Sequence, residues 1–155
     1  MSGYFRMRRD LRVPIAAMAV PPEVALEAFD PAQAGVCRDL MNRAYGEAGD
    51  EPVPVGAWYN TMVGDPQYDP SLVWVATSRS AVIGFCQCWR VPFVKDLVVE
   101  SGWRRRGIGA ALLNRALAEF ADRGATSVDL KTDIDNVKAQ SLYRRLGFVV
   151  VGENA

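Results

Sequence analysis

The sequence predicts a single-domain α/β (α+β) fold in which helices flank one mixed β-sheet. The chain has 155 residues, the length of one ordinary domain, and 50% hydrophobic with 23% charged residues is typical of globular proteins. Its apolar residues follow strand and helix periods in the order β, α, α, β, β, β, α, β, α, β. A strand–helix–strand unit over 93–132 implies parallel pairing and a hairpin over 72–89 antiparallel pairing, so the sheet should be mixed.

The first half of the chain predicts one strand and two helices. In order, we expect an N-terminal arm or extra strand (1–22), a strand (24–29), a helix (31–45), a loop (46–54) and a short helix (55–63). The first helix has a clear start, because Asp30 can cap it, Pro31 suits its first turn and Gln33 completes a capping box. Apolar residues at 37, 40, 41, 44 and 45 then have the i, i+3, i+4 spacing of an amphipathic helix.

The second half alternates strands and helices. The expected elements are two hairpin strands (72–77, 81–89), a strand (93–99), a helix opening at 104–109, a strand (127–132), a helix capped by Asp135 and a last strand (148–151). Gly124 and Gly147 follow the last apolar residue of each helix and are predicted to end them. No repeat or linker interrupts this series, so residues 23–155 should form one domain.

The missing residue types exclude several kinds of site. The chain has no histidine, which removes Ser-His-Asp triads, Cys-His dyads and zinc motifs that need a histidine ligand. Its three cysteines, Cys37, Cys86 and Cys88, are too few for a four-cysteine metal site or a disulfide framework. We therefore expect no metal, reduced core cysteines and a cytoplasmic location. No apolar run approaches the ~20 residues of a membrane helix, so no membrane partner is expected.

The net charge is zero, yet it is unevenly distributed. Residues 1–12 carry +3, residues 13–78 carry −7 and residues 79–155 carry +4. An acidic first half and a basic second half could bind a cation and an anion respectively. Scattered, solvated charge explains the same numbers, and both interpretations stay open at this point.

The segment from residue 98 to 110 predicts an anion site. A strand passes through a turn into a helix whose first residues are Arg104-Arg105-Arg106-Gly107-Ile108-Gly109. Free amides and the positive end of the helix dipole meet there, and glycine lets an anion approach, so a pyrophosphate could bind. The segment is not a Walker loop, because no Gly-Lys-Ser/Thr follows. It is not a dinucleotide-binding fingerprint either, because Leu112 stands where the third glycine would be. A plain helix start with solubilising arginines is the alternative; a nucleic-acid patch is disfavoured in a neutral protein.

Two motifs resemble those of a known enzyme family. Arg104-x-x-Gly107-x-Gly109 after a strand is similar to motif A of the GNAT superfamily of acyl-CoA N-acyltransferases. Asn136-x-x-Ala139-x-x-x-Tyr143-x-x-x-Gly147-Phe148 is similar to motif B, and one helix and one strand separate the two, as in that family. The resemblance covers residues 23–151. It implies a GNAT-like mixed sheet whose central strands, 93–99 and 127–132, splay apart to hold the arm of acetyl-CoA.

The resemblance also implies roles for single residues. The pyrophosphate of CoA would lie on the backbone amides of the motif A turn: Arg105, Arg106, Gly107, Ile108, Gly109 and Ala110. The pantetheine arm would pair with the backbone of Leu97, Val98 and Val99, where an amide near Val98 or Val99 would polarise the thioester carbonyl. Asn136 would hydrogen-bond the arm, and Tyr143 would give a proton to the departing thiolate.

Acid and base can also be considered from chemistry alone. A thiolate leaves more easily with a proton donor in reach, and without histidine the candidates are tyrosine, cysteine or water; a core tyrosine is the other interpretation of Tyr143. An amine of pKa ~10.4 is almost fully protonated at pH 7, so a base is needed. Asp96, in the strand beside the acyl carbonyl, is the first candidate and Glu100, at the strand's end, the second. Either could instead be structural or solvated.

The first helices and their loop set the acceptor in the family that the chain resembles. That region holds the acids Glu47, Asp50, Glu51, Asp65 and Asp69 and the aromatic residues Trp58, Tyr59 and Tyr68. Acids beside aromatic rings suit a cationic amine. A solvated acidic loop over an aromatic core fits equally well.

These features together predict an acetyl-CoA-dependent N-acetyltransferase. A small-molecule or peptide amine would attack the thioester directly in a ternary complex, because no Cys-His or Ser-His pair is present for a covalent route. The alternative is a non-catalytic acyl-CoA-binding sensor or regulatory module. Relatives usually have one more strand after the last one here, so we expect residues 11–20 to form a strand that covers the open edge, within the chain or in a homodimer.

Overall fold

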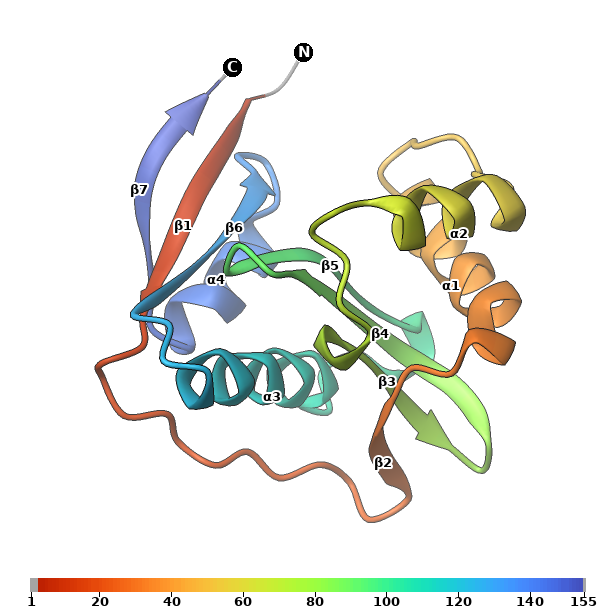
Figure 1. Cartoon of the computed structure of the whole chain (residues 1–155), viewed down its shortest axis with the longest axis horizontal. Helices are drawn as coiled ribbons and strands as arrows, with labels where there is room; N and C mark the ends of the chain where they lie inside the picture. The colour runs from red at the N-terminus through yellow and green to blue at the C-terminus, as the bar shows by residue number, and fades with distance from the viewer. Residues whose placement is uncertain (1–2, 155) are drawn as a thin grey trace.

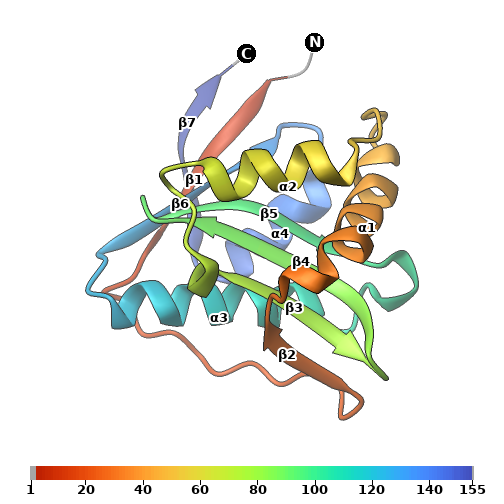
Figure 2. The same cartoon turned by 45° about the vertical axis from the view of Figure 1, so that its right-hand side comes forward.

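A seven-stranded mixed sheet organises the chain in the computed structural model, which describes residues 3–154. The strand order is β2-β3-β4-β5-β6-β1-β7, and helices lie on both faces (Figures 1 and 2). The strands are β1 (Tyr4–Asp10), β2 (Val24–Ala28), β3 (Val73–Ser78), β4 (Ala81–Trp89), β5 (Phe93–Val99), β6 (Ser127–Asp133) and β7 (Phe148–Asn154). The helices are α1 (Ala34–Gly46), α2 (Val55–Gly64), α3 (Ile108–Asp122) and α4 (Val137–Arg145). The pair β5–β6 is parallel and the other paired strands are antiparallel, so the predicted mixed sheet is confirmed.

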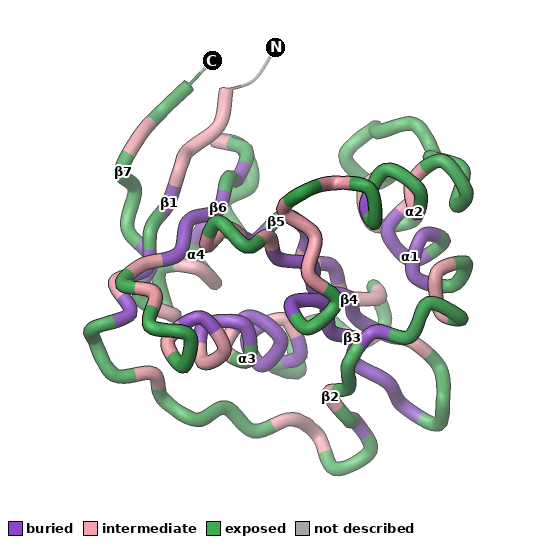
Figure 3. Tube along the Cα trace, in the orientation of Figure 1, coloured by how far each residue is buried: buried purple, intermediate pink, exposed green. Residues whose placement is uncertain are grey.

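Two apolar cores form, one on each face of the sheet. The larger lies under α3 and α4, where Leu112, Leu117 and Phe120 of α3 are almost fully buried. The smaller lies under α1 and α2 around Cys37, Met41 and Phe85. Burial along the chain is concentrated in β3, β4 and α3 and thins toward β7 (Figure 3). Each helix thus presents an apolar stripe to the sheet, as the 3.6-residue spacing predicts.

The helix boundaries follow local signals with one correction. The capping box is present, since Asp30 accepts from the Ala32 amide and Gln33 accepts from the Asp30 amide, both at 2.9 Å. It closes a short 3-10 turn that leads into α1. Gly124 and Gly147 take left-handed backbone angles, φ +84° and +94°, after their helices. The cap predicted at Asp135 is wrong by one residue, because Asn136 caps α4 by accepting from the Ala139 amide at 3.1 Å.

The N-terminal segment does not form the strand that was predicted. Residues 11–20 pair with no strand, and Tyr4–Asp10 form β1 instead. β1 lies inside the sheet, antiparallel to β6 on one side and to β7 on the other, as Figure 1 shows. The prediction failed because strand pairing depends on residues far away in the sequence. Four arginines among residues 6–12 give this segment a polar composition that is not typical of a strand, although its alternate residues Met7 and Arg9 face the core. The first two residues of the expected arm and Ala155 lie outside the described residues.

On the outward face of β1, two arginine side chains form ion pairs with an aspartate of β6. Arg6 donates to Asp129 at 2.6 Å and Arg8 donates to it at 2.7 and 2.9 Å. Burial works to raise the pKa of Asp129, but the hydrogen bonds from Arg8 and then Arg6 outweigh it and leave this pKa below its usual value. Arg6 and Arg8, which the sequence pattern alone would place in solvent, are therefore partners of a buried carboxylate.

The inward face of β1 carries a buried arginine that joins three segments. Arg9 is 6% exposed, and its guanidinium donates to the carbonyls of Leu146 at 2.8 Å, Val13 at 2.9 Å and Pro14 at 3.1 Å. Leu146 follows α4, whereas the other two belong to the arm that leaves β1. The Leu146 carbonyl, at the end of α4, thereby gains a hydrogen-bond donor that the helix itself does not supply. In return, the three carbonyls stabilise a guanidinium that would otherwise be costly to bury.

Gly147 offers a test of this arginine. We expect Gly147→Ala to lower the free energy of unfolding by about 2–4 kcal/mol, because a Cβ there would lie 2.7 Å from the Arg9 Nε as well as forcing alanine to φ +94°. Gly124→Ala is the matched control, since it has similar φ, +84°, but open space around its Cβ, and should cost only about 1–2 kcal/mol. Urea denaturation measures both. Equal losses would mean that Arg9 moves aside freely.

Candidate functional site

A gap in the sheet begins where β5 and β6 stop pairing. The two strands pair only at Phe93 with Asp129 and at Val94 with Leu130. Between β4 and β5 the register shifts, because Gln87 opposes Asp96 while Cys88 opposes Val94, so Lys95 is an extra, bulged residue. Beyond it, the edge of β5 that faces β6 is paired with no strand of the described chain. The splayed central strands that the resemblance implied are therefore confirmed.

The gap leads to the start of α3. Gly107 caps the helix with φ +80°, and Arg105 before it also has a left-handed angle, φ +64°. The first-turn amides of Ile108, Gly109 and Ala110 have no partner within the helix. A Cβ on Gly109 would lie 3.5 Å from the Val99 side chain, so the helix start is held close to the end of β5. Unpaired amides and the positive end of the helix dipole thus lie at the end of the gap, where an anion would be stabilised.

The three arginines of the turn have different surroundings. Arg104 donates to the Val99 carbonyl at 3.1 Å and to Glu47 at 2.8 Å, so it ties the turn to the loop after α1. Arg106 lies over the Trp103 ring, 4.8 Å from its centroid. Arg105 is exposed and makes no side-chain hydrogen bond with residues 3–154. Arg105 and Arg106 are the two left beside the free amides.

On the β6 side of the gap, α4 contributes Tyr143 and Asn136. Burial, and then the nearby Cys86, raise the pKa of Tyr143 to about 12. Its ring packs against Phe148, with centroids 6.0 Å apart, and its hydroxyl has no hydrogen bond within residues 3–154. Since no fully buried polar side-chain atom of these residues lacks a partner, that hydroxyl keeps contact with accessible space. Asn136 uses its oxygen to cap α4, which leaves its amide nitrogen free.

On the other side of the gap, Asp96 is bound by Tyr45, a residue that the sequence pattern placed only on the apolar face of a helix. The Tyr45 hydroxyl, at the end of α1, donates to Asp96 at 2.5 Å, and Asp96 is 8% exposed. Burial first, and then the Asp96 charge, raise the pKa of Tyr45 well above its usual value, and Tyr143 adds to this rise. The two tyrosines therefore lie within electrostatic range of each other. The only sequence signal for Tyr45 was a polar hydroxyl on the apolar face of a helix.

The second candidate base lies elsewhere. Glu100 follows β5 and accepts from Arg43 of α1 at 3.1 Å. It lies four positions after Asp96, which is about 13 Å along an extended strand. The structure thus does not bring the two carboxylates together: Asp96 lies near the bulge and Glu100 near the turn that leads to α3.

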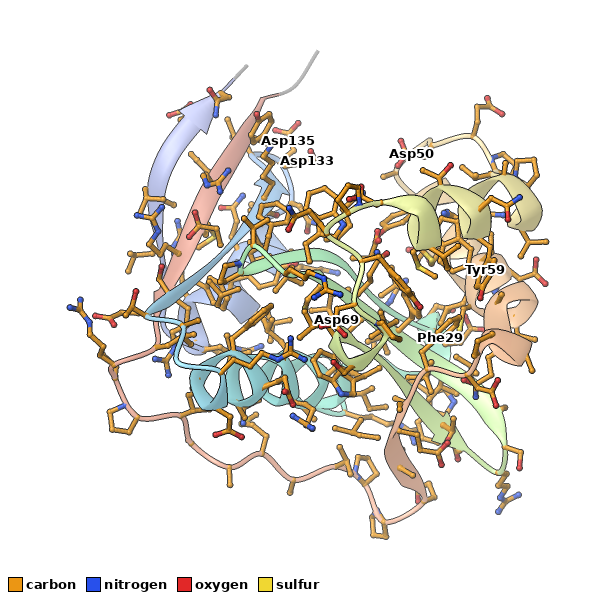
Figure 4. All side chains as sticks on the ribbon, viewed as in Figure 1. Phe29, Asp50, Tyr59, Asp69, Asp133 and Asp135 are labelled. Atoms are coloured by element: carbon orange, nitrogen blue, oxygen red, sulfur yellow. The ribbon has the colours of Figure 1, made fainter. Side chains whose placement is uncertain are left out.

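The acids predicted to surround a cationic amine are mostly engaged with the chain itself. Glu47 pairs with Arg104, and Asp65 accepts from the Gln67 amide at 2.8 Å. Asp69 is bound by Ser71 and Arg123, which lower its pKa to about 2. Figure 4 shows Asp50 in the loop between α1 and α2, apart from Asp69, which lies at the turn before β3. For these residues the arrangement favours the alternative of structural and solvated acids.

A cavity of about 240 Å³ opens at the bulge. Its walls are Trp89, Phe93, Val94, Lys95 and Lys131. The rings of Trp89 and Phe93 stack with centroids 5.4 Å apart, and the Lys95 ammonium lies 5.8 Å from the Trp89 ring. Lys95, the bulged residue, lines this cavity, so the cavity lies where the two central strands separate.

Metal and membrane features are absent from the described part of the chain. Residues 3–154 contain no group of three or more His, Cys, Asp or Glu side chains placed to hold a metal ion. None of their helices combines the length and the apolar character that crossing a membrane requires. The three cysteines are buried, unpaired thiols, as predicted, and the sulfurs of Cys86 and Cys88 lie 3.9 Å apart.

Comparison with known proteins agrees with this geometry. Residues 35–148 match the family described as acetyltransferase (GNAT) family. A mycothiol acetyltransferase of Beutenbergia cavernae is 33% identical over 98 residues, covering 59% of this chain and 33% of that protein. A mycothiol acetyltransferase of Thermobispora bispora is 28% identical over 161 residues, covering 93% and 52%. The fold matches a GCN5-related N-acetyltransferase from Sphaerobacter thermophilus with TM-score 0.84 at 24% identity, covering 98% and 49%. The chain therefore spans about half, or less, of these relatives.

The bond between Tyr45 and Asp96 should contribute to stability. We expect Tyr45→Phe to lower the free energy of unfolding by about 1–3 kcal/mol, because it leaves a buried carboxylate without its hydrogen bond. Tyr59→Phe, on α2, is the matched control: its hydroxyl makes no hydrogen bond with residues 3–154, and its loss should change stability by less than about 0.5 kcal/mol. Urea denaturation at pH 7 compares them. A Tyr45 variant as stable as the control would contradict this view of the pair.

Proposed function

The chain belongs to the GNAT family of acetyltransferases, and from this premise we propose that it transfers an acetyl group from acetyl-CoA to a primary amine. The observation that carries the proposal is the gap between β5 and β6, which runs from the bulge at Lys95 to the free amides of α3 and has Tyr143 on one side and Asp96 on the other. An unpaired strand edge, an anion site and two proton-transferring groups are the parts that this reaction needs.

The residues of the gap fit a CoA thioester. The amides of the turn, Arg105 to Ala110, would hold the pyrophosphate, since those of Ile108, Gly109 and Ala110 have no other partner. The free edge of Leu97, Val98 and Val99 would pair with the pantetheine amides, like an added strand. The unused amide of Asn136 would donate to the same arm. When bound, acetyl-CoA supplies an acetyl group activated as a thioester.

Proton transfer would be divided between the two sides of the gap. Asp96 would take a proton from the acceptor ammonium, directly or through water, so that the amine nitrogen can bond to the acetyl carbon. The amide near Val98 would stabilise negative charge on the carbonyl oxygen. As the carbon–sulfur bond breaks, Tyr143 would give its proton to sulfur, which leaves as the thiol of CoA, and the second proton lost by the nitrogen would restore the tyrosine hydroxyl. Tyr143 suits this role because its raised pKa keeps it protonated throughout the physiological range.

Direct transfer is supported by the state of the cysteines. Burial raises the pKa of Cys37 to about 12, and the pKa of Cys88 is also raised, by burial and by Cys86. Such thiols are protonated at neutral pH and poorly nucleophilic. An acyl-enzyme on these two cysteines is therefore disfavoured, in keeping with a ternary complex.

The acceptor class includes small-molecule and peptide amines. A mycothiol-type acceptor is one member of the first class, because several relatives are named mycothiol acetyltransferase. The second proposal for the whole chain, a non-catalytic acyl-CoA sensor, would need the anion site but not Tyr143. Cytoplasmic location and a homodimer remain predictions, and sedimentation equilibrium would test the latter.

Tyr143→Phe separates the enzyme from the sensor. We expect kcat to fall about 100-fold or more, because the variant lacks the proton donor. Acetyl-CoA at about 100 times its Kd should still raise the Tm by about 5–10 °C, as in the wild type, and ATP should not. Thiol release measures turnover, and Tyr4→Phe is the control. Because the pKa of Tyr143 is raised to about 12, its loss of a proton should not limit wild-type kcat below about pH 11.

Unchanged turnover in Tyr143→Phe would exclude this residue as the acid. Binding of acetyl-CoA without acetylation of any amine by the wild type would favour the sensor. If neither acetyl-CoA nor CoA shifts the Tm, both acyl-CoA proposals are wrong.

Substitution of each carboxylate tests the base. We expect Asp96→Asn to lower kcat/KM about 100-fold at pH 7. The deficit should shrink as the pH approaches the amine pKa of ~10.4, because a neutral amine needs no base. Glu100→Gln should change kcat/KM only a few-fold, since Glu100 pairs with Arg43 away from the bulge. Values of kcat/KM measured between pH 6 and 10 for both variants test this prediction. A large loss in Glu100→Gln with little change in Asp96→Asn would make Glu100 the base.

A further inference from the structure

Arg38 is a buried charge that the proposed acetyl transfer leaves unused. It lies on α1 and is 6% exposed. None of the ion pairs among residues 3–154 includes it. Within the same residues, its one side-chain hydrogen bond runs from Nε to Asn42 Oδ1 at 2.9 Å. A guanidinium taken out of water without an anionic partner is costly, so its retention calls for a reason.

Two aromatic rings orient this guanidinium. Its Cζ lies 5.6 Å from the ring centroid of Trp58 on α2 and 5.9 Å from that of Tyr45 on α1. With Nε engaged by Asn42, the terminal nitrogens Nη1 and Nη2 remain without side-chain or carbonyl partners in the described chain. Because none of its fully buried polar side-chain atoms lacks a partner, both nitrogens must reach accessible space. The fork of Arg38 is thus held in place with its donating end open.

Tyr45 links Arg38 to the proposed base. Tyr45 contacts Arg38 with its ring and donates its hydroxyl to Asp96, so the cation and the carboxylate lie on one tyrosine. The Arg38 charge also works to lower the pKa of Tyr45, against the larger effects of burial and Asp96. A molecule whose ammonium faces Asp96 could therefore place a second group at Arg38.

We propose that Arg38 binds a carboxylate of the acceptor, so that this protein acetylates amines that also carry a carboxylate group. The inference rests on the proposed acetyl transfer. Two free terminal nitrogens in a planar fork match the two oxygens of a carboxylate, and this pairing neutralises the buried charge. Asp96 then receives the ammonium proton while Arg38 holds the other end of the molecule.

Matched pairs of amines test the proposal. 4-Aminobutyrate is compared with 4-aminobutanamide, and glycylglycine with glycylglycinamide, by release of CoA from acetyl-CoA. In the wild type we expect kcat/KM to be at least about 10-fold higher for each acid than for its amide. Arg38→Gln should remove this preference through a higher KM for the acids and leave the amides unchanged. Arg115→Gln, on the outer side of α3 where Arg115 is bound by Glu119, is the matched control and should keep the preference.

The remaining outcomes are also decisive. Equal use of acid and amide by the wild type, or a preference that survives in Arg38→Gln, overturns the proposal. If Arg38→Gln fails to fold by thermal unfolding, Arg38→Lys keeps the charge without the fork and should lose most of the preference. If no amine is acetylated, the proposed function fails separately. Calorimetric titration of the CoA-saturated protein with 4-aminobutyrate and its amide then decides, and absence of acid-selective binding by the wild type overturns the role of Arg38.

Discussion

The bulge at Lys95 is the feature on which the rest of the molecule depends. One extra residue in β5 leaves the two central strands paired at only two positions, so the sheet opens beyond them. Unpaired backbone inside a protein is unfavourable, and a sheet that keeps such an edge has to offer it to something. The helices are arranged around this opening: α3 starts at one end of it, α4 borders the β6 side, and α1 reaches it with Tyr45.

The sheet on the β6 side is completed by the start of the chain. β1 lies between β6 and β7, and its two faces are held by different means: Arg6 and Arg8 bind Asp129 on one face, and Arg9 binds carbonyls on the other. The arm that follows β1 runs along α3, where Asn114 donates to the Ala16 carbonyl at 2.6 Å. The border of the gap formed by α4 is therefore secured by residues about 140 positions earlier in the chain.

Charge is distributed along the gap in a way that matches acetyl transfer from CoA. The amides of α3 and two free arginines lie at one end, and the buried Asp96 lies near the other. Tyr143 faces the same opening with a hydroxyl that burial keeps protonated. On α1, Tyr45 lies between Asp96 and the buried Arg38, whose two terminal nitrogens have no partner within residues 3–154. Each of these groups is costly to bury alone, and together they are the basis for the proposed acceptor, an amine that also carries a carboxylate.

The sequence by itself determined the order of helices and strands from β2 onward, the capping box at Asp30, the glycines that end the helices and the turn before α3. All of these depend on residues that are near in sequence, through periodicity, caps and backbone angles. Only the tertiary structure decided that residues 4–10 rather than 11–20 enter the sheet, and that Asp96 meets Tyr45, 51 residues away. An alternating pattern shows which face of a strand is buried, but it does not determine which strands pair with it. A tyrosine or arginine on an apolar face likewise gains its role from partners that only the packing of α1 and α2 against the sheet brings into contact.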